Sequence, residues 1–143
     1  MFVICGDIAQ RPCDARGRQA TGQSEIHRSF SVPLSASASK SSGKLANVHR
    51  FLWRNWQRKQ RAVVDVTFWG TDFGAVYTVY IRPDESGHWT VTEYVRHYQL
   101  PEREPEGTNL VATGIDLRPR RLRSGAFVVR LVNQHGITLP LFE

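Results

Sequence analysis

The sequence is poor in cysteine and contains no long apolar run. Its 143 residues include two cysteines, Cys5 and Cys13, and their spacing matches no zinc-binding pattern because no second pair of ligands follows. We therefore expect neither a metal site nor a cofactor. No apolar stretch approaches the roughly 20 residues that cross a bilayer, and the N-terminal MFVIC is too short for the apolar part of a signal sequence. These absences predict a soluble protein of the cytoplasm.

Sequence motifs of catalysis are absent as well. No histidine stands beside a Ser, Cys or carboxylate in the spacing of a catalytic triad, a metal motif or a phosphate-binding loop. The histidines are His27, His49, His88, His97 and His135. Glu93 falls on the apolar side of a predicted strand, where it is either a buried acid or base or a residue that a bulge exposes. The sequence favours a binding protein and leaves an enzyme possible.

Acidic residues are missing from one long stretch of the chain. None occurs from Ile26 to Val64, although this stretch is rich in arginine. Over the whole chain 19 Lys and Arg exceed 13 Asp and Glu, and the net charge is +6. Such an excess favours anionic partners, for example nucleic acid or an acidic protein.

The chain is divided into a leading tail and one domain. Residues 31–44, SVPLSASASKSSGK, are small and polar and offer little surface to bury. We therefore predict a flexible tail over residues 1–43 and a single domain over residues 44–143, which is long enough to build a core. Residues 100–109, LPEREPEGTN, predict a break between two ordered parts of that domain.

Residues 44–61, KLANVHRFLWRNWQRKQR, have the spacing of an amphipathic helix. Four apolar side chains share one stripe, which we expect to be buried: Leu45, Val48, Leu52 and Trp56. Four arginines, which we call the arginine ridge, lie on the opposite side: Arg50, Arg54, Arg58 and Arg61. The ridge fits a solvated face, a face neutralised by the acidic EREPE at residues 102–106, or a site for phosphates.

Three stretches after the helix alternate with period two, as half-buried strands do. They are AVVDVTFW at 62–69, AVYTVYIR at 75–82 and HWTVTEYV at 88–95, and tight-turn residues connect them. A further hairpin is predicted over residues 126–142. The expected fold class is α+β, with one amphipathic helix packed on an antiparallel sheet of three consecutive strands and a C-terminal β-hairpin.

Aromatic and basic residues also occur on the polar side of these strands. Trp69, Tyr80 and Tyr94 are candidates for stacking on the bases of single-stranded nucleic acid, although Thr and Tyr are common on any half-exposed strand. The segment RPRRLR, residues 118–123, is either a solvated loop or a flexible contact for phosphates. Its arginines are Arg118, Arg120, Arg121 and Arg123.

These patterns predict a non-enzymatic module that binds nucleic acid or another anionic polymer through the arginine ridge, with RPRRLR as an auxiliary arm. One alternative is a small-ligand or enzyme pocket between the helix and the sheet, lined by Phe68, Tyr77 and Trp89. Another is a protein-interaction domain whose partner supplies the missing acids.

Overall fold

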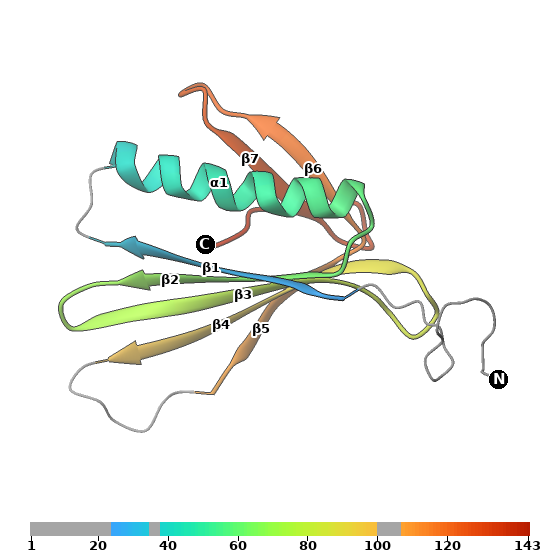
Figure 1. Cartoon of the computed structure of the whole chain (residues 1–143), viewed down its shortest axis with the longest axis horizontal. Coiled ribbons are helices and arrows are strands. Elements are labelled where there is room, and N and C mark those ends of the chain that lie inside the picture. The colour runs from blue at the N-terminus through green and yellow to red at the C-terminus, as the bar shows by residue number, and fades with distance from the viewer. Residues whose placement is uncertain (1–23, 35–37, 100–106) are drawn as a thin grey trace.

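The computed structural model describes residues 24–34, 38–99 and 107–143 of the protein, with the side chains of residues 38–42 left aside. Within these residues the chain forms one helix and eight strands in two sheets (Figure 1). In chain order the elements are β1 (Ile26–Pro33), α1 (Ala38–Gln57), β2 (Ala62–Trp69), β3 (Phe73–Pro83), β4 (Trp89–Gln99), β5 (Asn109–Gly114), β6 (Asp116–Arg121), β7 (Phe127–Val132) and β8 (Thr138–Leu139). The predicted fold of one helix on a three-stranded sheet is therefore wrong.

The large sheet has the strand order β1-β2-β3-β4-β5. Its centre is the predicted meander, because β2, β3 and β4 pair in antiparallel fashion through tight turns. The two edges of the sheet differ from the prediction. β5 extends the meander on one side, and β1 pairs with β2 in parallel on the other, with α1 as the crossover between them.

The strand β1 lies in the segment predicted to be a flexible tail. Its side chains are mostly exposed, and only Phe30, Val32 and Pro33 are partly or fully buried. An edge strand that buries so few side chains has no clear period-two pattern, so it could not be predicted from the sequence. Residues 1–23, which contain both cysteines, and residues 100–106, which contain EREPE, lie outside the described residues.

The helix α1 begins and ends earlier than predicted. It starts at Ala38 and stops at Gln57, because Lys59 adopts the left-handed conformation with φ of 50°. The amide of Gln60 donates to the carbonyl of Asn55, and that of Lys59 donates to the carbonyl of Trp56, which closes the helix end. Arg58 and Arg61 therefore lie beyond the helix, although the apolar stripe is buried as predicted at Val48, Leu52 and Trp56.

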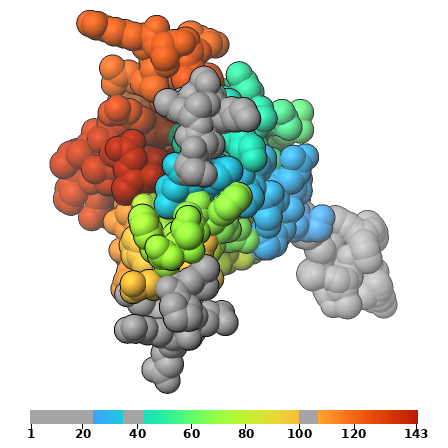
Figure 2. All heavy atoms as spheres, turned by 90° about the vertical axis from the view of Figure 1, so that its left-hand side faces the viewer, coloured from blue at the N-terminus to red at the C-terminus, as the bar shows by residue number. Residues whose placement is uncertain are grey.

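The small sheet, β6-β7-β8, packs beside α1 on one face of the large sheet, which we call the inner face. Leu117, Val129 and Leu131 belong to the same buried cluster as the helix stripe and the apolar side chains of β2 and β3. Seen from the end at which the β2–β3 turn lies, the helix and the C-terminal residues occupy the same side of the sheet (Figure 2). The RPRRLR segment, which was predicted to be a loop, mostly forms β6.

The opposite face of the large sheet, which we call the outer face, carries partly exposed polar and aromatic side chains from β2, β3 and β4. Among the described elements, α1 and the small sheet both pack on the inner face. The described part of the chain contains no helix that is both long and apolar enough to cross a membrane.

Candidate functional site

The outer face is ordered by the strand register. Because side chains alternate between faces, those next to the buried Val64, Val66, Val79 and Val91 point outward. Thr78 of β3 pairs with Asp65 of β2 on one side and with Tyr94 of β4 on the other. Tyr80 of β3 pairs with Thr92 of β4. The register thus places two tyrosines diagonally across adjacent strands, within reach of each other.

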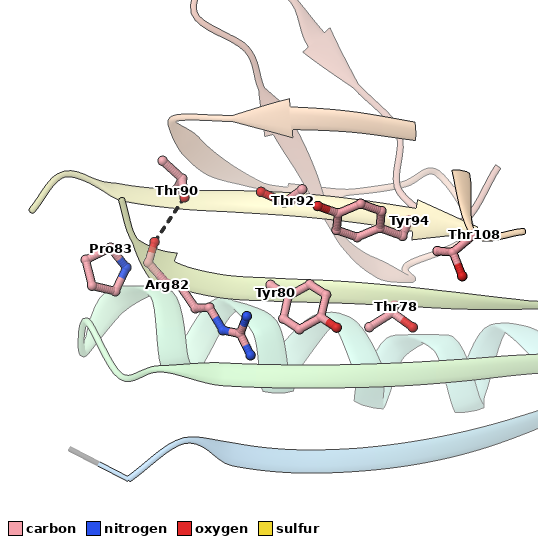
Figure 3. Close-up of a pocket in the computed structure, with 8 residues that line it drawn as sticks. All are labelled: Thr78, Tyr80, Arg82, Pro83, Thr90, Thr92, Tyr94 and Thr108. Atoms are coloured by element: carbon pink, nitrogen blue, oxygen red, sulfur yellow. Dashed lines mark hydrogen bonds between the residues drawn. The ribbon is translucent and has the colours of Figure 1, made fainter. Parts of the chain in front are cut away.

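These side chains surround an open hollow of about 490 Å³. Figure 3 shows the lining residues together on the sheet, with α1 behind it. They are Thr78, Tyr80, Arg82, Pro83, Thr90, Thr92, Tyr94 and Thr108. Six of these eight residues carry a hydroxyl group, so the hollow offers many short hydrogen-bonding groups around two aromatic rings.

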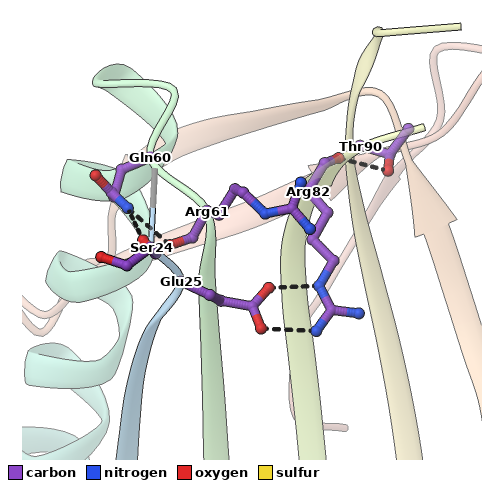
Figure 4. Close-up of polar contacts among 6 residues, drawn as sticks. All are labelled: Ser24, Glu25, Gln60, Arg61, Arg82 and Thr90. Atoms are coloured by element: carbon purple, nitrogen blue, oxygen red, sulfur yellow. Dashed lines mark hydrogen bonds and ion pairs between the residues drawn. The ribbon is translucent and has the colours of Figure 1, made fainter. Parts of the chain in front are cut away.

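A chain of contacts fixes the rings and the single arginine of the hollow. The Nε and Nη2 atoms of Arg82 donate to the two carboxylate oxygens of Glu25, at 2.5 and 2.7 Å (Figure 4). The Arg82 guanidinium lies 4.1 Å from the centre of the Tyr80 ring, and this ring meets Tyr94 edge to face at 5.8 Å. The bidentate ion pair therefore holds a stacked Arg–Tyr pair in one orientation.

Glu25, beside the hollow, is influenced by two arginines. Arg61 and Arg82 both act on Glu25, and the hydrogen bond from Arg82 is the main reason that the pKa of Glu25 is lowered. Two guanidinium groups thus share one carboxylate. Glu25 takes Nε and Nη2, and among the described residues the Nη1 group of Arg82 has no hydrogen-bond partner, so its donors can serve a ligand.

A second polar chain crosses the same face. The Nε2 atom of His27 lies 2.5 Å from Oδ2 of Asp65, and the hydroxyl of Thr78 donates to Oδ1 of the same carboxylate at 2.7 Å. Asp65 therefore links β1, β2 and β3 across the outer face. Both of its oxygens are engaged, so it presents less free negative charge to a ligand than its position suggests.

The aromatic surface continues along β4. Tyr98 pairs with Gly74, and a Cβ atom at position 74 would lie 2.4 Å from the Tyr98 hydroxyl oxygen. Gly74 therefore leaves room for the Tyr98 side chain to lie across β3. Arg82 was expected on this exposed face but was not named as a site residue, and neither Tyr98 nor Glu25 was predicted. Their signal was the outward parity of Arg82 and Tyr98, whereas nothing local pointed to Glu25, which is 57 residues from its partner.

Of the predicted stacking residues, Tyr80 and Tyr94 line the hollow and Trp69 does not. Trp69 is 45% exposed at the end of β2, where its carbonyl accepts a hydrogen bond from the amide of Leu34. Leu34 and Phe73 are exposed large apolar residues as well. The structure thus separates Trp69 from the two tyrosines.

The arginine ridge does not form one surface with the hollow. Arg50 and Arg54 are exposed on α1, which packs on the inner face, and Arg58 is exposed just beyond the helix end. No carboxylate among the described residues lies within salt-bridge distance of these three side chains. Arg61 lies beyond the end of α1 and is not part of this exposed surface; its positive charge instead helps to lower the pKa of Glu25.

The arginines of RPRRLR lie on the same half of the molecule as the ridge. Arg118, Arg120 and Arg121 belong to β6, and Arg123 follows in the exposed turn. Arg118 pairs directly with Arg130 of β7, so two like charges stand opposite each other. The half of the molecule around α1 and the small sheet is therefore rich in exposed arginine.

The predicted pocket between helix and sheet is filled by the chain itself. Phe68, Tyr77 and Trp89 pack against the buried cluster, and Phe142, which follows β8, lies between Tyr77 and His49. Glu93 lies in this interior and is fully buried. A register shift between Glu93 and Tyr94 marks a β-bulge, but the bulge does not expose the carboxyl group.

Comparison of the chain with protein-family models, curated proteins and solved structures gives no match.

Proposed function

We propose that this protein is a non-enzymatic module that binds single-stranded nucleic acid on the outer face of its large sheet. The observation that carries the proposal is the cluster of Arg82, Tyr80 and Tyr94 around an open hollow on an exposed sheet. Aromatic rings on such a face stack on bases of any sequence, and arginine contacts the phosphates that follow.

The chemistry around the rings supports this class of ligand. The threonine hydroxyls of the hollow match sugar and phosphate oxygens, and the Nη1 donors of Arg82 suit a phosphate. The pair with Glu25 fixes the guanidinium before the ligand arrives, which reduces the entropic cost of binding.

The exposed arginines of α1 and β6 have an auxiliary role in this proposal. They lie on the half of the molecule that faces away from the hollow, so a short strand on the outer face does not reach them. A longer polymer that wraps around the sheet edge meets Arg50, Arg54 and Arg58, where each phosphate contact adds to the salt dependence of binding. The same arginines, which have no carboxylate within salt-bridge distance among the described residues, also fit an acidic protein surface, which is the second candidate. Location in the cytoplasm remains a prediction.

Binding of labelled single-stranded oligonucleotides tests the proposal. For a strand of about six nucleotides, Tyr94→Ala should weaken binding by roughly 1–3 kcal/mol for each stacked base lost. Tyr94→Phe keeps the ring and should bind as the unaltered protein does. Arg82→Gln should reduce the slope of log affinity against log salt by about 0.7, the value for one phosphate of a single strand.

Strand length separates the two arginine surfaces. Exchange of Arg54 and Arg58 for Gln should leave binding of the short strand unchanged and weaken binding of one of about 30 nucleotides, because only the longer strand reaches α1. Absence of binding to either strand at about 50 mM salt, where counterion release favours association, would exclude the nucleic-acid proposal and leave the acidic protein partner.

A further inference from the structure

Phe142, in the segment that follows β8, is held between two aromatic side chains of the inner face. Its ring meets His49 at 5.5 Å and Tyr77 at 6.0 Å between centroids, edge to face in both cases. Only 8% of the residue is exposed. Its φ of 67° lies in the left-handed region, which is unfavourable for a side chain of this size. Contacts of the ring and the amide, and not backbone preference, therefore keep Phe142 in place.

Beneath the ring, Glu93 offers more hydrogen-bonding capacity than the chain uses. Its Oε2 atom accepts the amide N–H of Phe142 at 2.7 Å. Its Oε1 atom is buried and has no hydrogen-bond partner among the described residues. A buried polar atom without a partner destabilises a fold, and such atoms in native proteins often mark a functional site. The β-bulge beside Glu93 is a second feature that is common near such sites.

We propose that Glu93, His49 and Tyr77 form a binding site for a 2-arylethylamine, and that Phe142 occupies this site from within the chain. The nitrogen, Cα, Cβ and phenyl ring of a phenylalanine residue have the connectivity of 2-phenylethylamine. The contacts of Phe142 therefore show how such a ligand sits, with its ring between His49 and Tyr77 and its nitrogen on Glu93.

A free amine fulfils the hydrogen-bonding capacity of Glu93 better than the Phe142 amide does. The amide of Phe142 has a single N–H and serves Oε2 alone, whereas an ammonium group has three donors and serves both oxygens of Glu93. Hydrogen bonds between an ammonium and a carboxylate are also stronger than those from a neutral amide. A hydrogen bond to Oε1 is therefore available to the proposed ligand but not to Phe142.

Entry to the site requires movement of Pro140–Glu143, which follow β8. Within the described residues, the sole hydrogen bond made by Pro140–Glu143 is the one from Phe142 to Glu93. A hollow of about 80 Å³, lined among others by His49, Leu141 and Glu143, already lies beside this segment. The site is on the inner face, away from the outer-face hollow, so it is independent of the proposed nucleic-acid function.

Calorimetric titration of a Phe142→Gly variant with 2-phenylethylamine tests the site. Glycine tolerates the positive φ, and its amide is retained. At about pH 8 the amine is still protonated, since alkyl amines titrate near 10. We expect the amine to bind at least about tenfold more tightly than 2-phenylethanol, which has the same size and one neutral donor. Adding Glu93→Gln should remove this preference and leave the affinity for the alcohol within about twofold.

A second measurement uses the unaltered chain and does not depend on the stability of a variant. Saturation with 2-phenylethylamine should accelerate hydrogen exchange of the Phe142 amide about tenfold or more, because the ligand replaces this amide on Glu93. The alcohol should have a smaller effect. Equal binding of amine and alcohol by the glycine variant, or unchanged exchange at Phe142 in the intact chain at saturation, would overturn the proposal. Oligonucleotide binding should be unaffected by the amine in either case.

Discussion

Trp56 and Asp116 are joined by a hydrogen bond although 60 residues separate them. The indole Nε1–H donates to Oδ1 of Asp116 at 3.1 Å, and the same oxygen accepts the amide of Leu117 at 2.9 Å. The last turn of α1 is thereby tied to the first residues of β6. This contact connects the helix that covers the large sheet with the small sheet beside it.

We expect Trp56→Ala to destabilise the protein by roughly 3–5 kcal/mol, since it removes a buried aromatic side chain and its hydrogen bond. Trp56→Phe should cost less, because it loses the hydrogen bond but keeps a ring. Arg54→Ala, on the exposed side of the same helix, should change stability by less than about 0.5 kcal/mol. Chemical denaturation measures all three, and equal losses at positions 54 and 56 would contradict the described orientation of α1.

The pH dependence of stability should reveal two buried groups with opposite effects. Burial lowers the pKa of His49 to about 4, so its contribution to stability is lost as the pH falls below about 6.5, where the unfolded histidine gains its proton. Burial raises the pKa of Glu93 to about 7, so its contribution is lost as the pH rises above about 4.5, where the unfolded carboxyl ionises. Between these limits the two slopes oppose each other.

Single variants should separate the two slopes. In Glu93→Gln, stability should fall by about 3 kcal/mol from pH 6.5 to pH 4.5, because only the histidine remains and one pKa unit is worth about 1.4 kcal/mol. In His49→Asn, stability should fall by a similar amount over the same range in the opposite direction, toward pH 6.5. Urea denaturation at several pH values provides the test. A steep dependence in the unaltered protein would show that the two groups do not offset each other.

Removal of residues 1–43 should strongly destabilise the protein. This truncation deletes β1 with the buried side chain of Val32, the Glu25 partner of Arg82, and the start of α1 from Ala38. Loss of the Val32 contacts and of one strand of the sheet should together cost at least about 2–3 kcal/mol. Removal of residues 1–23 alone deletes none of these contacts and serves as the matched control. A chain that starts at Lys44 and has the melting temperature of the full-length protein would show that β1 contributes nothing to stability.

Gly74→Ala should disturb both stability and the outer face. The new Cβ atom would lie 2.4 Å from the carbonyl oxygen of Phe68 and equally close to the Tyr98 hydroxyl, so the backbone and the ring must both move. We expect a loss of about 1–3 kcal/mol, as overpacked positions show. Gly107→Ala, which has nothing within 4 Å, is the control. Thermal melting of both variants measures the difference.

Part of the fold could be predicted from local sequence pattern. The strands β2, β3 and β4 alternate clearly because one face of each is buried and the other is polar, and the stripe of α1 was visible for the same reason. The strands β1, β5 and β6 were not predicted, because their side chains are mostly exposed. Their pairing depends on backbone hydrogen bonds to neighbours, which leave no period in the sequence.

The candidate sites were predictable to a similar extent. Tyr80 and Tyr94 followed from strand parity, but the pair of Glu25 with Arg82 and the seat of Phe142 on Glu93 depend on residues far apart in the chain. Arg61 lies outside the arginine ridge because the helix ends before Lys59, whose positive φ could not be predicted from a lysine side chain. Long-range contacts and positive backbone angles are properties of the folded chain, not of a short segment.

The parallel pairing of β1 with β2 sets an order of assembly. A strand that pairs in parallel with the next strand must wait until the intervening crossover has formed, whereas β2, β3 and β4 are joined by short turns and close small loops. During synthesis β1 leaves the ribosome before its partner exists, and it remains an unpaired segment until α1 and β2 have followed. The first strand of the chain is therefore expected to dock after the meander, which makes it the slow step of folding and the point at which a nascent chain is most open to a wrong strand partner.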